Sequence, residues 1–328
     1  MTPASARGMT RLVVVVLLLC IGILAAAWII KNPEERALDE DARANAPCCF
    51  VTTSVGTTHY QVAGSGSRVA VLVHGFSVPS YIWDSTFVAL SAAGYRVIRY
   101  DMLGRGWSDR PDLPYDATTY NEQLLGLLDS LHVQGPVDLF GLSFGGLVVS
   151  QFTADHPDRV RTLTYVDPVV NRGSDPGFLS WPLIGPYVFQ VMAVPSMPAG
   201  QPTDFLHAER FPGWEDRYRE QMKYRGFGRA LRRSREWSAV ADFPALHERI
   251  KTAGTPVLLI WGRQDETLPF SLSAVLQQRI PTLEFVAVDS SGHLPQLEQA
   301  ALFNATVLDF LARHAPADPA TTAAPRAR

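Results

Sequence analysis

Short β-rich runs alternate with helical patterns from about residue 50 to near the C-terminus, and this order restricts the possible folds more than any other feature. Such alternation is typical of a parallel sheet that is covered by helices. Residues 120–131 and 295–313 carry apolar side chains at three- and four-residue spacing, as helices that face a core do. The sequence therefore predicts an α/β fold, with strands at residues 69–73, 95–100, 137–140, 161–166, 256–261 and 283–288.

One long segment breaks this alternation. Residues 169–246 are rich in Trp, Phe, Pro, Met and Arg and contain no clear β-rich run. We expect this segment to be an insertion that covers one edge of the sheet, and its aromatic content suits a lid over an apolar pocket. At the C-terminus, residues 315–328 repeat Pro, Ala and Thr, and we expect them to be disordered.

The composition is that of a globular protein, because 47% of the 328 residues are apolar and 19% are charged. The net charge of −3 offers no basic surface for nucleic acid, so we expect no nucleic-acid partner. Three cysteines are too few to indicate a disulfide framework. Cys48 and Cys49 are adjacent, and neighbouring cysteines rarely bridge because an extended chain does not bring their side chains together. We therefore expect free thiols at these two positions.

An unbroken apolar run covers residues 12–30, with Arg7 and Arg11 before it and Lys31 after it. A transmembrane helix needs about 20 apolar residues. The run therefore predicts a membrane anchor within residues 1–31.

A cleaved signal peptide is the alternative, because the alanines at positions 25–27 offer a plausible cleavage site. The apolar run continues past these alanines through Trp28, which favours the anchor. Basic residues before the run favour a cytoplasmic start, so the body of the protein would lie on the extracytoplasmic side, or be secreted if the segment is cleaved. Residues 32–49, rich in charge and alanine, are expected to form a tether.

The strongest chemical signal is the sequence GLSFGG at residues 141–146, a Gly-x-Ser-x-Gly pattern directly after a predicted strand and before a helical run. A serine on so sharp a turn has its hydroxyl pushed out above the sheet, and the small residues on either side let the strand and helix approach each other. The start of the following helix also presents free N–H groups and the positive end of its dipole. Ser143 is therefore the candidate nucleophile.

A serine hydroxyl needs a base to take its proton, and the base needs a carboxylate to orient it. Asp265 and His293 each follow a predicted strand, and the carboxyl ends of parallel strands share one edge of the sheet. We therefore expect Ser143, Asp265 and His293 to form a catalytic triad. Asp167 also follows a strand and is the alternative acid.

An oxyanion hole needs backbone donors that point at the developing negative charge. The N–H of Phe144 follows the nucleophile directly, and the N–H of Phe76 lies in the loop after residues 69–73, where Gly75 would let the backbone come close. We expect these two amides to form the hole. His74 in the same loop is expected to brace the backbone by hydrogen bonds rather than to transfer protons.

Five segments of the chain together resemble the α/β-hydrolase superfamily over residues 50–313: VLVHGF, DMLGRGWSDRP, LFGLSFGG, LIWGRQDETLP and SSGHLPQLE. The resemblance implies a mostly parallel eight-stranded sheet flanked by helices, with a helical cap after the sixth strand. Residues 50–168 and 247–314 would form the core, and residues 169–246 the cap. The resemblance also implies the triad and oxyanion hole named above, with no metal or organic cofactor. Dehalogenases and epoxide hydrolases in this superfamily use an aspartate nucleophile, which Ser143 does not match.

These features predict an enzyme that hydrolyses carboxylic esters through an acyl-enzyme on Ser143. The membrane segment and aromatic insertion favour an apolar acyl substrate, resembling those of monoacylglycerol lipases and carboxylesterases. The expected partners are this small ester and the membrane, with no obligate protein partner. Three alternatives stay open: a hydrolase of carbon–carbon bonds in ring-fission products, an acyltransferase, and a ligand-binding protein of the same fold without activity.

Overall fold

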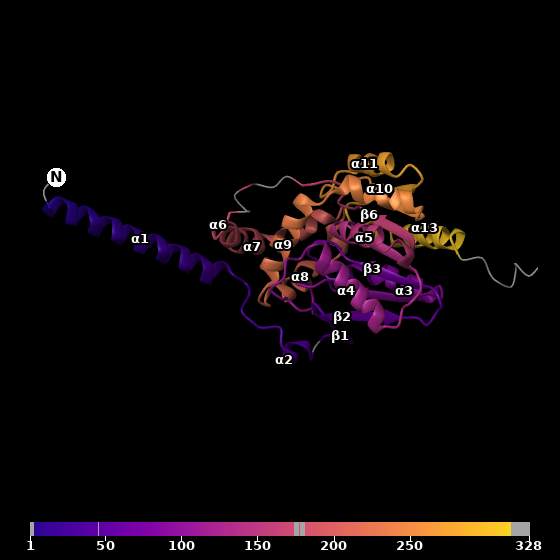
Figure 1. Cartoon of the computed structure of the whole chain (residues 1–328), viewed down its shortest axis with the longest axis horizontal. Helices are drawn as coiled ribbons and strands as arrows, with labels where there is room; N and C mark the ends of the chain where they lie inside the picture. Colours follow the sequence, from indigo (N-terminus) through magenta and orange to yellow (C-terminus); the bar gives the residue numbers. More distant parts are fainter. Residues whose placement is uncertain (1–2, 45, 174–176, 178–180, 316–328) are drawn as a thin grey trace, which may run out of the picture.

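An eight-stranded sheet forms the centre of the computed structural model, which describes residues 3–44, 46–173, 177 and 181–315 (Figure 1). The strand order is β1-β2-β4-β3-β5-β6-β7-β8. β2 is antiparallel to both of its neighbours, and every other neighbouring pair is parallel. The strands are β1 (Phe50–Thr53), β2 (Gly56–Ala63), β3 (Val69–Val73), β4 (Arg96–Tyr100), β5 (Val137–Leu142), β6 (Val160–Val166), β7 (Val257–Gly262) and β8 (Glu284–Val288).

The mostly parallel eight-stranded sheet expected from the sequence is confirmed. The six strands predicted from apolar runs correspond to β3 to β8, with ends that differ by at most two residues. β1 and β2 carry threonines and other polar side chains and gave no apolar run. They lie at one end of the sheet, where one face of an antiparallel pair can meet solvent and the apolar signal is correspondingly weak.

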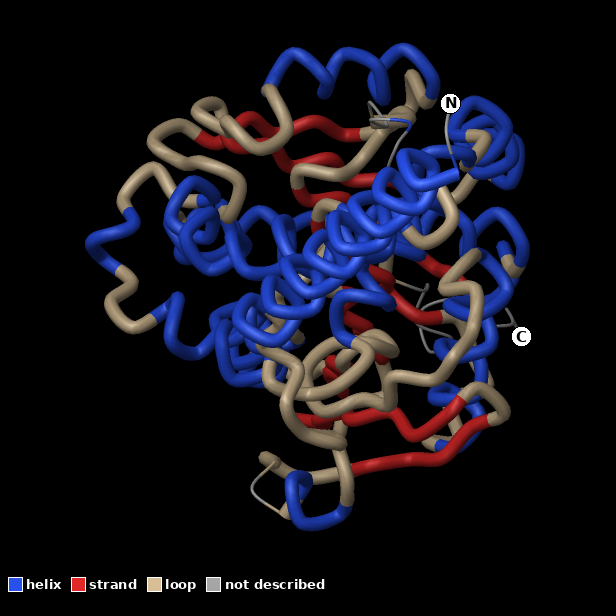
Figure 2. The backbone as a smooth tube through the Cα atoms, turned by 90° about the vertical axis from the view of Figure 1, so that its left-hand side faces the viewer, coloured by secondary structure: helices blue, strands red, loops and turns tan. Residues whose placement is uncertain are grey.

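Helices cover both faces of the sheet, and each face carries its own apolar cluster (Figure 2). In β3, Val71 and Val73 join one cluster while Ala70 and Leu72 join the other, as the alternation of side chains along a strand requires. All four are fully buried, which explains the continuous apolar run in the sequence. The helices outside the cap are α1 (Pro3–Lys31), α2 (Glu40–Arg43), α3 (Asp84–Ala92), α4 (Ala117–Ser130), α5 (Phe144–Asp155), α10 (Phe243–Ala253), α11 (Ser273–Arg279), α12 (Pro295–Glu298) and α13 (Ala300–Arg313).

The chain between β6 and β7 carries a group of helices that we call the cap, residues 184–240. The next helix, α10, packs on α5 and so belongs to the layer that covers the sheet. The predicted limits of the insertion, residues 169 and 246, stay predictions. The helices of the cap are α6 (Ile184–Val188), the π-helical turn η4 (Phe189–Ala193), α7 (Val194–Gly200), α8 (Trp214–Met222) and α9 (Phe227–Val240).

The long helix α1 projects from the body, and only its C-terminal part lies near the cap (Figure 1). Met9–Lys31 is long and apolar enough to cross a membrane, and none of it is buried against the protein. A signal sequence meets the same description, so the choice between anchor and signal stays open. The predicted disordered tail, from position 316 onward, lies outside the described residues.

The expectation of free thiols at Cys48 and Cys49 is wrong, because the structure joins the two residues in a disulfide. That expectation assumed an extended chain. Both residues instead adopt positive φ angles, 30° and 71°, which an extended chain does not. The backbone turns sharply at this point, and the two side chains meet.

Close contact between α5 and β3 depends on Gly145. A Cβ atom at this position would lie 2.4 Å from the carbonyl oxygen of His74 and 2.7 Å from that of Val73. Backbone atoms cannot move aside as a flexible side chain can. The helix therefore starts against the strand only because position 145 has no side chain.

We predict that Gly145→Ala destabilises the protein by about 1–3 kcal/mol, the range for overpacking a tight site. The matched control is Gly135→Ala, because a Cβ atom at Gly135 would meet nothing within 4 Å. Thermal unfolding of the full-length protein in detergent checks this. Equal midpoints for the two variants would contradict the predicted clash.

Candidate active site

Ser143 occupies the sharp turn between β5 and α5 in a backbone conformation that non-glycine residues rarely adopt. Its φ is 53° and its ψ is −120°. Its amide donates to the carbonyl oxygen of Val166 at 2.9 Å, and its own carbonyl accepts from the amides of Gly146 and Val169. These bonds hold the turn from both sides. The sequence prediction of a serine on a strained strand-to-helix turn is thereby supported by the geometry.

The other candidate residues follow the next strands of the sheet in order. Asp167 follows β6, Asp265 follows β7 and His293 follows β8, while Ser143 follows β5. These four strands are parallel neighbours. Their carboxyl ends therefore form one edge of the sheet, and all four side chains belong to loops at that edge.

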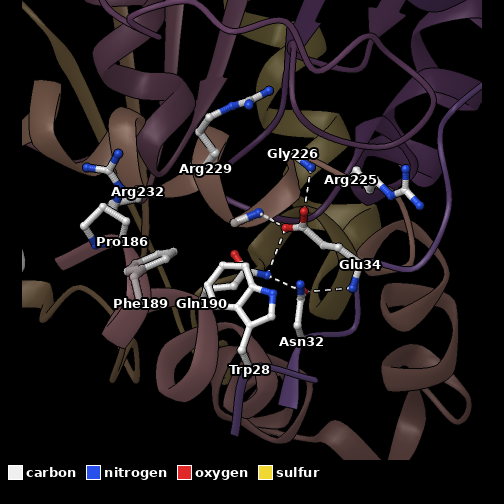
Figure 3. Close-up of a pocket in the computed structure, with 11 residues that line it drawn as sticks. Trp28, Asn32, Glu34, Pro186, Phe189, Gln190, Arg225, Gly226, Arg229 and Arg232 are labelled. Carbon is white, nitrogen blue, oxygen red and sulfur yellow. Dashed lines mark hydrogen bonds between the residues drawn. The ribbon is translucent and has the colours of Figure 1, made fainter. Parts of the chain in front are cut away.

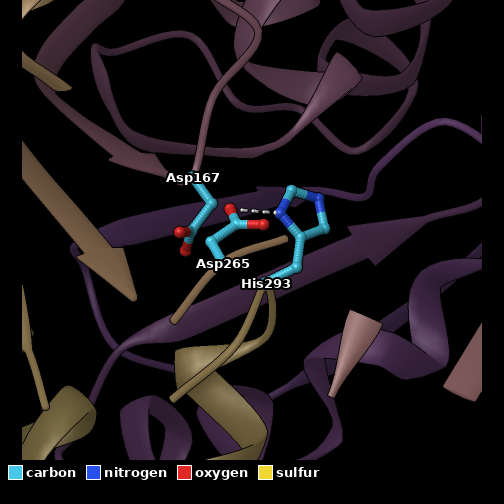
Figure 4. Close-up of side chains that lie close together, drawn as sticks. All are labelled: Asp167, Asp265 and His293. Atoms are coloured by element: carbon cyan, nitrogen blue, oxygen red, sulfur yellow. Dashed lines mark hydrogen bonds and ion pairs between the residues drawn. The ribbon is translucent and has the colours of Figure 1, made fainter. Parts of the chain in front are cut away.

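Asp265 and His293 form a direct hydrogen bond (Figure 4). Nδ1 of His293 lies 2.8 Å from Oδ2 of Asp265, and Oδ1 of Asp265 accepts from the amides of Thr267 at 2.9 Å and Leu268 at 2.8 Å. Burial lowers the pKa of His293, but the charge and hydrogen bond of Asp265 and the charge of Asp204 outweigh it, so that the pKa of His293 is raised. The carboxylate thus fixes the ring and favours its protonated form.

Asp167, the alternative acid, lies beside this pair without a direct hydrogen bond to the imidazole in the described structure (Figure 4). It is fully buried, and its Oδ1 accepts from the amide of Gly262 at 2.9 Å. Burial, and then the charge of Asp265, raise the pKa of Asp167 well above its usual range.

Polar atoms of Asp167, Asp265 and His293 lie within 4.8 Å of one another, a spacing that could also hold a metal ion. The direct Asp265–His293 bond and the raised pKa of Asp167 instead suit an acid–base cluster.

Ser143 and His293 reach the same edge of the sheet, but no hydrogen bond joins the serine hydroxyl to the imidazole among the described residues. Ser143 instead lines a cavity of about 400 Å³. This cavity extends to Thr267 and Leu268, the two residues whose amides donate to Asp265. Its other lining residues are Phe76, Phe144, Val169, Asn171, Gly173, Arg235, Ser238 and Ala239.

The two predicted oxyanion-hole residues both line this cavity. Phe144 is the first residue of α5, so its N–H has no acceptor within the helix. The loop of Phe76 passes close to the serine, since a Cβ atom at Gly75 would lie 3.4 Å from Cβ of Ser143. His74 braces this loop as expected, because its Nδ1 bonds the carbonyl of Gly75 and its Nε2 accepts from a backbone amide of the next loop, both at 2.9 Å. Burial lowers the pKa of His74 to about 4, so its ring is neutral at pH 7.

Arg105 is a buried cation next to these residues that the sequence gave no reason to select. Its Nε donates to the carbonyl oxygen of Phe76 at 2.9 Å, and its other nitrogens donate to the hydroxyls of Tyr120 at 2.7 Å and Ser234 at 2.8 Å. The guanidinium carbon of Arg105, Cζ, lies 5.8 Å from the ring centroid of Phe76 and 5.7 Å from that of Phe144. Arg105 therefore both holds the Phe76 loop and places positive charge near the predicted oxyanion hole.

Glu298 is a second residue that sequence reasoning missed. Its buried carboxylate accepts from the amide of Gly292 at 2.7 Å and from the amide of Leu206, in the cap, at 2.8 Å. The amide of His293 in turn donates to the carbonyl oxygen of Asp204, also in the cap, at 2.8 Å. The cap and the loop of His293 are thus bonded to each other. A glutamate near the start of a predicted helix offers no sequence signal for such a contact.

Known proteins with similar sequences include hydrolases. The chain is 26% identical over 283 residues to the AB hydrolase superfamily protein YfhM of Bacillus subtilis, covering 80% of this chain and 97% of that protein. It is 28% identical over 270 residues to a 2-hydroxy-6-oxononadienedioate/2-hydroxy-6-oxononatrienedioate hydrolase of Paraburkholderia phymatum, covering 77% and 90% of the two chains. The crystal structure of the enol-lactonase from Burkholderia xenovorans LB400 is similar with a TM-score of 0.71 and 25% identity, covering 80% of this chain and 100% of that one.

A family model described as "Alpha/beta hydrolase family" matches residues 70–306, well over half of the chain. The matched residues run from β3 into α13 and contain the whole edge on which Ser143, Asp265 and His293 lie. The sheet order, the strained serine turn and this match agree with one another. The chain therefore belongs to the alpha/beta hydrolase family.

Proposed function

We propose that this hydrolase cleaves carboxylic esters through an acyl-enzyme on Ser143. The observation that carries the proposal is a strained serine that opens to a cavity, on the same sheet edge as the hydrogen-bonded pair Asp265–His293. A hydrolase acting on a small molecule is what the family supports. The ester bond and the roles of individual residues are our proposal.

In the proposed mechanism, His293 takes the proton of the Ser143 hydroxyl as the oxygen attacks the acyl carbon. Asp265 stabilises the imidazolium that forms, and the amides of Phe76 and Phe144 donate to the oxyanion. His293 then gives its proton to the leaving alcohol, and water releases the acyl group by the same steps. Proton transfer requires Ser143 and His293 to approach hydrogen-bond distance, and such contacts commonly tighten when substrate binds.

The cavity favours an apolar acyl group, because Phe76, Phe144, Val169 and Leu268 supply much of its lining. The solved relative described as an enol-lactonase adds support, since a lactone is a cyclic ester. We therefore propose a substrate of the lipase or carboxylesterase type.

Carbon–carbon bond hydrolysis is the second candidate. The relative from Paraburkholderia phymatum is named as a hydrolase of a 2-hydroxy-6-oxo diacid, and the same triad would serve such a substrate. A diacid would need cationic contacts, and Arg235 lines the cavity. The two candidates are distinguished by substrate turnover.

For the location, we propose that α1 stays attached as a membrane anchor and that the hydrolase domain lies on the extracytoplasmic side. The exposed apolar surface of Met9–Lys31 supports an apolar environment for this helix. Arg7 and Arg11 before the span support a cytoplasmic start. Secretion after signal cleavage is the alternative.

We predict that the full-length protein hydrolyses chromogenic esters and reacts with a fluorophosphonate probe. Ser143→Ala should abolish labelling and lower kcat by about 10⁴-fold or more, because the nucleophile is lost. Ser238→Ala is the matched control, since Ser238 lines the same cavity, and it should keep both activities. Turnover of a dienoic diketone without any ester turnover would contradict ester hydrolysis and favour the second candidate.

We also predict a pH dependence that His293 controls. The imidazole accepts a proton only when neutral, so kcat/KM should fall as pH drops through its pKa, which is raised above 6.5. Asp265→Asn removes the charge that raises this pKa, so the acidic limb should move to lower pH and kcat should fall by about 10⁴-fold.

The control for this prediction is Asp167→Asn. Burial raises the pKa of Asp167 and so favours its neutral form, and an amide of the same shape should leave the pH profile close to that of the unmodified protein. The measurement is kcat/KM from pH 5 to 9 for all three proteins. A greater loss from Asp167→Asn than from Asp265→Asn would make Asp167 the catalytic acid.

We predict that the protein stays in the membrane fraction after a high-salt wash. An anchored chain should also retain its N-terminal residues, which intact mass measurement checks. A soluble protein that lacks about the first 27 residues would show instead that α1 is a cleaved signal.

A further inference from the structure

The cap contacts α1 inside its apolar span rather than at its polar end. The hydroxyl of Tyr187, in α6, donates to the carbonyl oxygen of Leu24 at 2.8 Å. The Tyr187 ring also stacks on Trp28, with ring centroids 6.0 Å apart. The turn η4 contacts α1 as well, and Figure 1 shows α6 and α7 beside the end of this helix. Part of the cap therefore lies alongside the segment that would cross a membrane.

The length of α1 gives the depth of this contact. The 23 residues of Met9–Lys31 extend about 34 Å at about 1.5 Å per residue, slightly more than the hydrocarbon core of about 30 Å. Leu24 precedes Lys31 by about 10 Å along the helix axis. In a bilayer centred on the span, the Tyr187–Leu24 contact would lie about 8 Å below the hydrocarbon boundary.

The chain around Tyr187, at the start of the cap and just before it, carries large apolar side chains that are exposed. Leu183 is 87% exposed, Met192 68%, Trp181 57% and Ile184 49%. We call residues 181–192, which comprise the start of the cap and the three residues before it, the cap tip. Four exposed large apolar side chains within twelve residues of sequence are a feature that marks membrane or protein contacts.

Basic residues of the cap lie around the chain at and just after the C-terminal end of α1 (Figure 3). Arg225, Arg229 and Arg232 line a cavity of about 500 Å³ together with Trp28, Asn32 and the carboxylate of Glu34. Arg229 also forms an ion pair with Asp112 at 3.7 Å, and Arg232 forms one with Glu236. Lipid phosphates lie at this level of a bilayer, and arginine binds phosphate well. Tryptophan is likewise enriched at the boundary between lipid and water. Apolar residues at hydrocarbon depth and cations at headgroup depth together match a lipid bilayer.

The segment after α1 keeps the cap in this position. Glu34 accepts from the amide of Gly226 at 2.6 Å and from that of Gly228 at 2.7 Å, at the start of α9 (Figure 3). The amide of Glu35 donates to the carbonyl oxygen of Lys223 at 2.9 Å. Residues 34–35, predicted as part of a tether, are thus bonded to the cap. The orientation of the cap relative to α1 is therefore constrained by hydrogen bonds before the end of the helix, at Leu24, and after it, at Glu34.

We propose that the cap tip is embedded in the lipid leaflet around the C-terminal half of α1. The proposal rests on α1 remaining as an anchor. It also deepens the proposed function, because α9 lines the arginine cavity with Arg229 near its start and the Ser143 cavity with Ser238 near its end. An apolar ester in the leaflet would then lie about 20 Å, the length of α9, from the nucleophile.

The test uses the full-length protein in phosphatidylcholine vesicles that contain lipids with a nitroxide quencher on the acyl chain. An environment-sensitive fluorophore is attached to Ile184→Cys or to Leu302→Cys, both in a Cys20→Ser background. Labelling proceeds without reductant, so that the Cys48–Cys49 disulfide stays closed. Leu302 is the matched control, because it is 50% exposed and lies in α13, on the opposite side of the body from α1 (Figure 1).

We expect the nitroxide lipid to quench the label at Ile184 several-fold more strongly than the label at Leu302, and aqueous iodide to show the reverse order. Vesicle flotation after a carbonate wash reports the anchor separately. A protein that floats but shows equal iodide quenching at both positions would overturn the embedded cap tip and leave the anchor intact. A protein that does not float would overturn both. Neither readout depends on catalysis, so the ester proposal is tested independently.

Discussion

The turn between β5 and α5 fixes Ser143 in a positive-φ conformation, and the rest of the site is arranged around it. A backbone in this region relaxes unless its neighbours prevent it. Here the amide of Ser143 is bonded to the adjacent strand β6, and Gly145 lets α5 begin against β3. The strain is therefore held by the most deeply buried part of the sheet. The serine side chain is presented to the cavity because the backbone beneath it has no room to turn away.

Charge is distributed unevenly around the cavity. On the side of His293 lie three carboxyl groups, Asp265, Asp204 and Asp167, and burial raises the pKa of Asp167, which disfavours a third negative charge there. On the side of Phe76 and Phe144 lies the buried guanidinium of Arg105. In the proposed reaction, positive charge develops on the imidazole and negative charge on the acyl oxygen. Each would develop beside fixed charge of the opposite sign, which is the arrangement that lowers an electrostatic barrier.

The sequence predicted the parts of this structure that arise from local pattern. Buried parallel strands are continuous apolar runs, so β3 to β8 were found, whereas the polar strands β1 and β2 were not. Ser143, Asp265 and His293 were selected as candidates because each follows such a run, and their catalytic roles stay predictions. Arg105 and Glu298 were missed because their importance lies in contacts with residues distant in sequence, such as Ser234 and Leu206. The turn that closes the disulfide at residues 48–49 likewise depends on a backbone conformation that the sequence alone does not indicate.

Glu34 receives the first N–H groups of α9, a role usually filled by a residue of the helix's own N-terminus. Helix α9 lines the cavity at Ser143, and the amides at the start of this helix are bonded by a residue that follows α1. Because Glu34 is bonded to the start of α9, a change in the tilt of α1 would shift Glu34 and with it this helix. With α1 as the proposed anchor, a membrane of different thickness would tilt this helix to match the lipid, and the shape of the cavity at Ser143 would change as well.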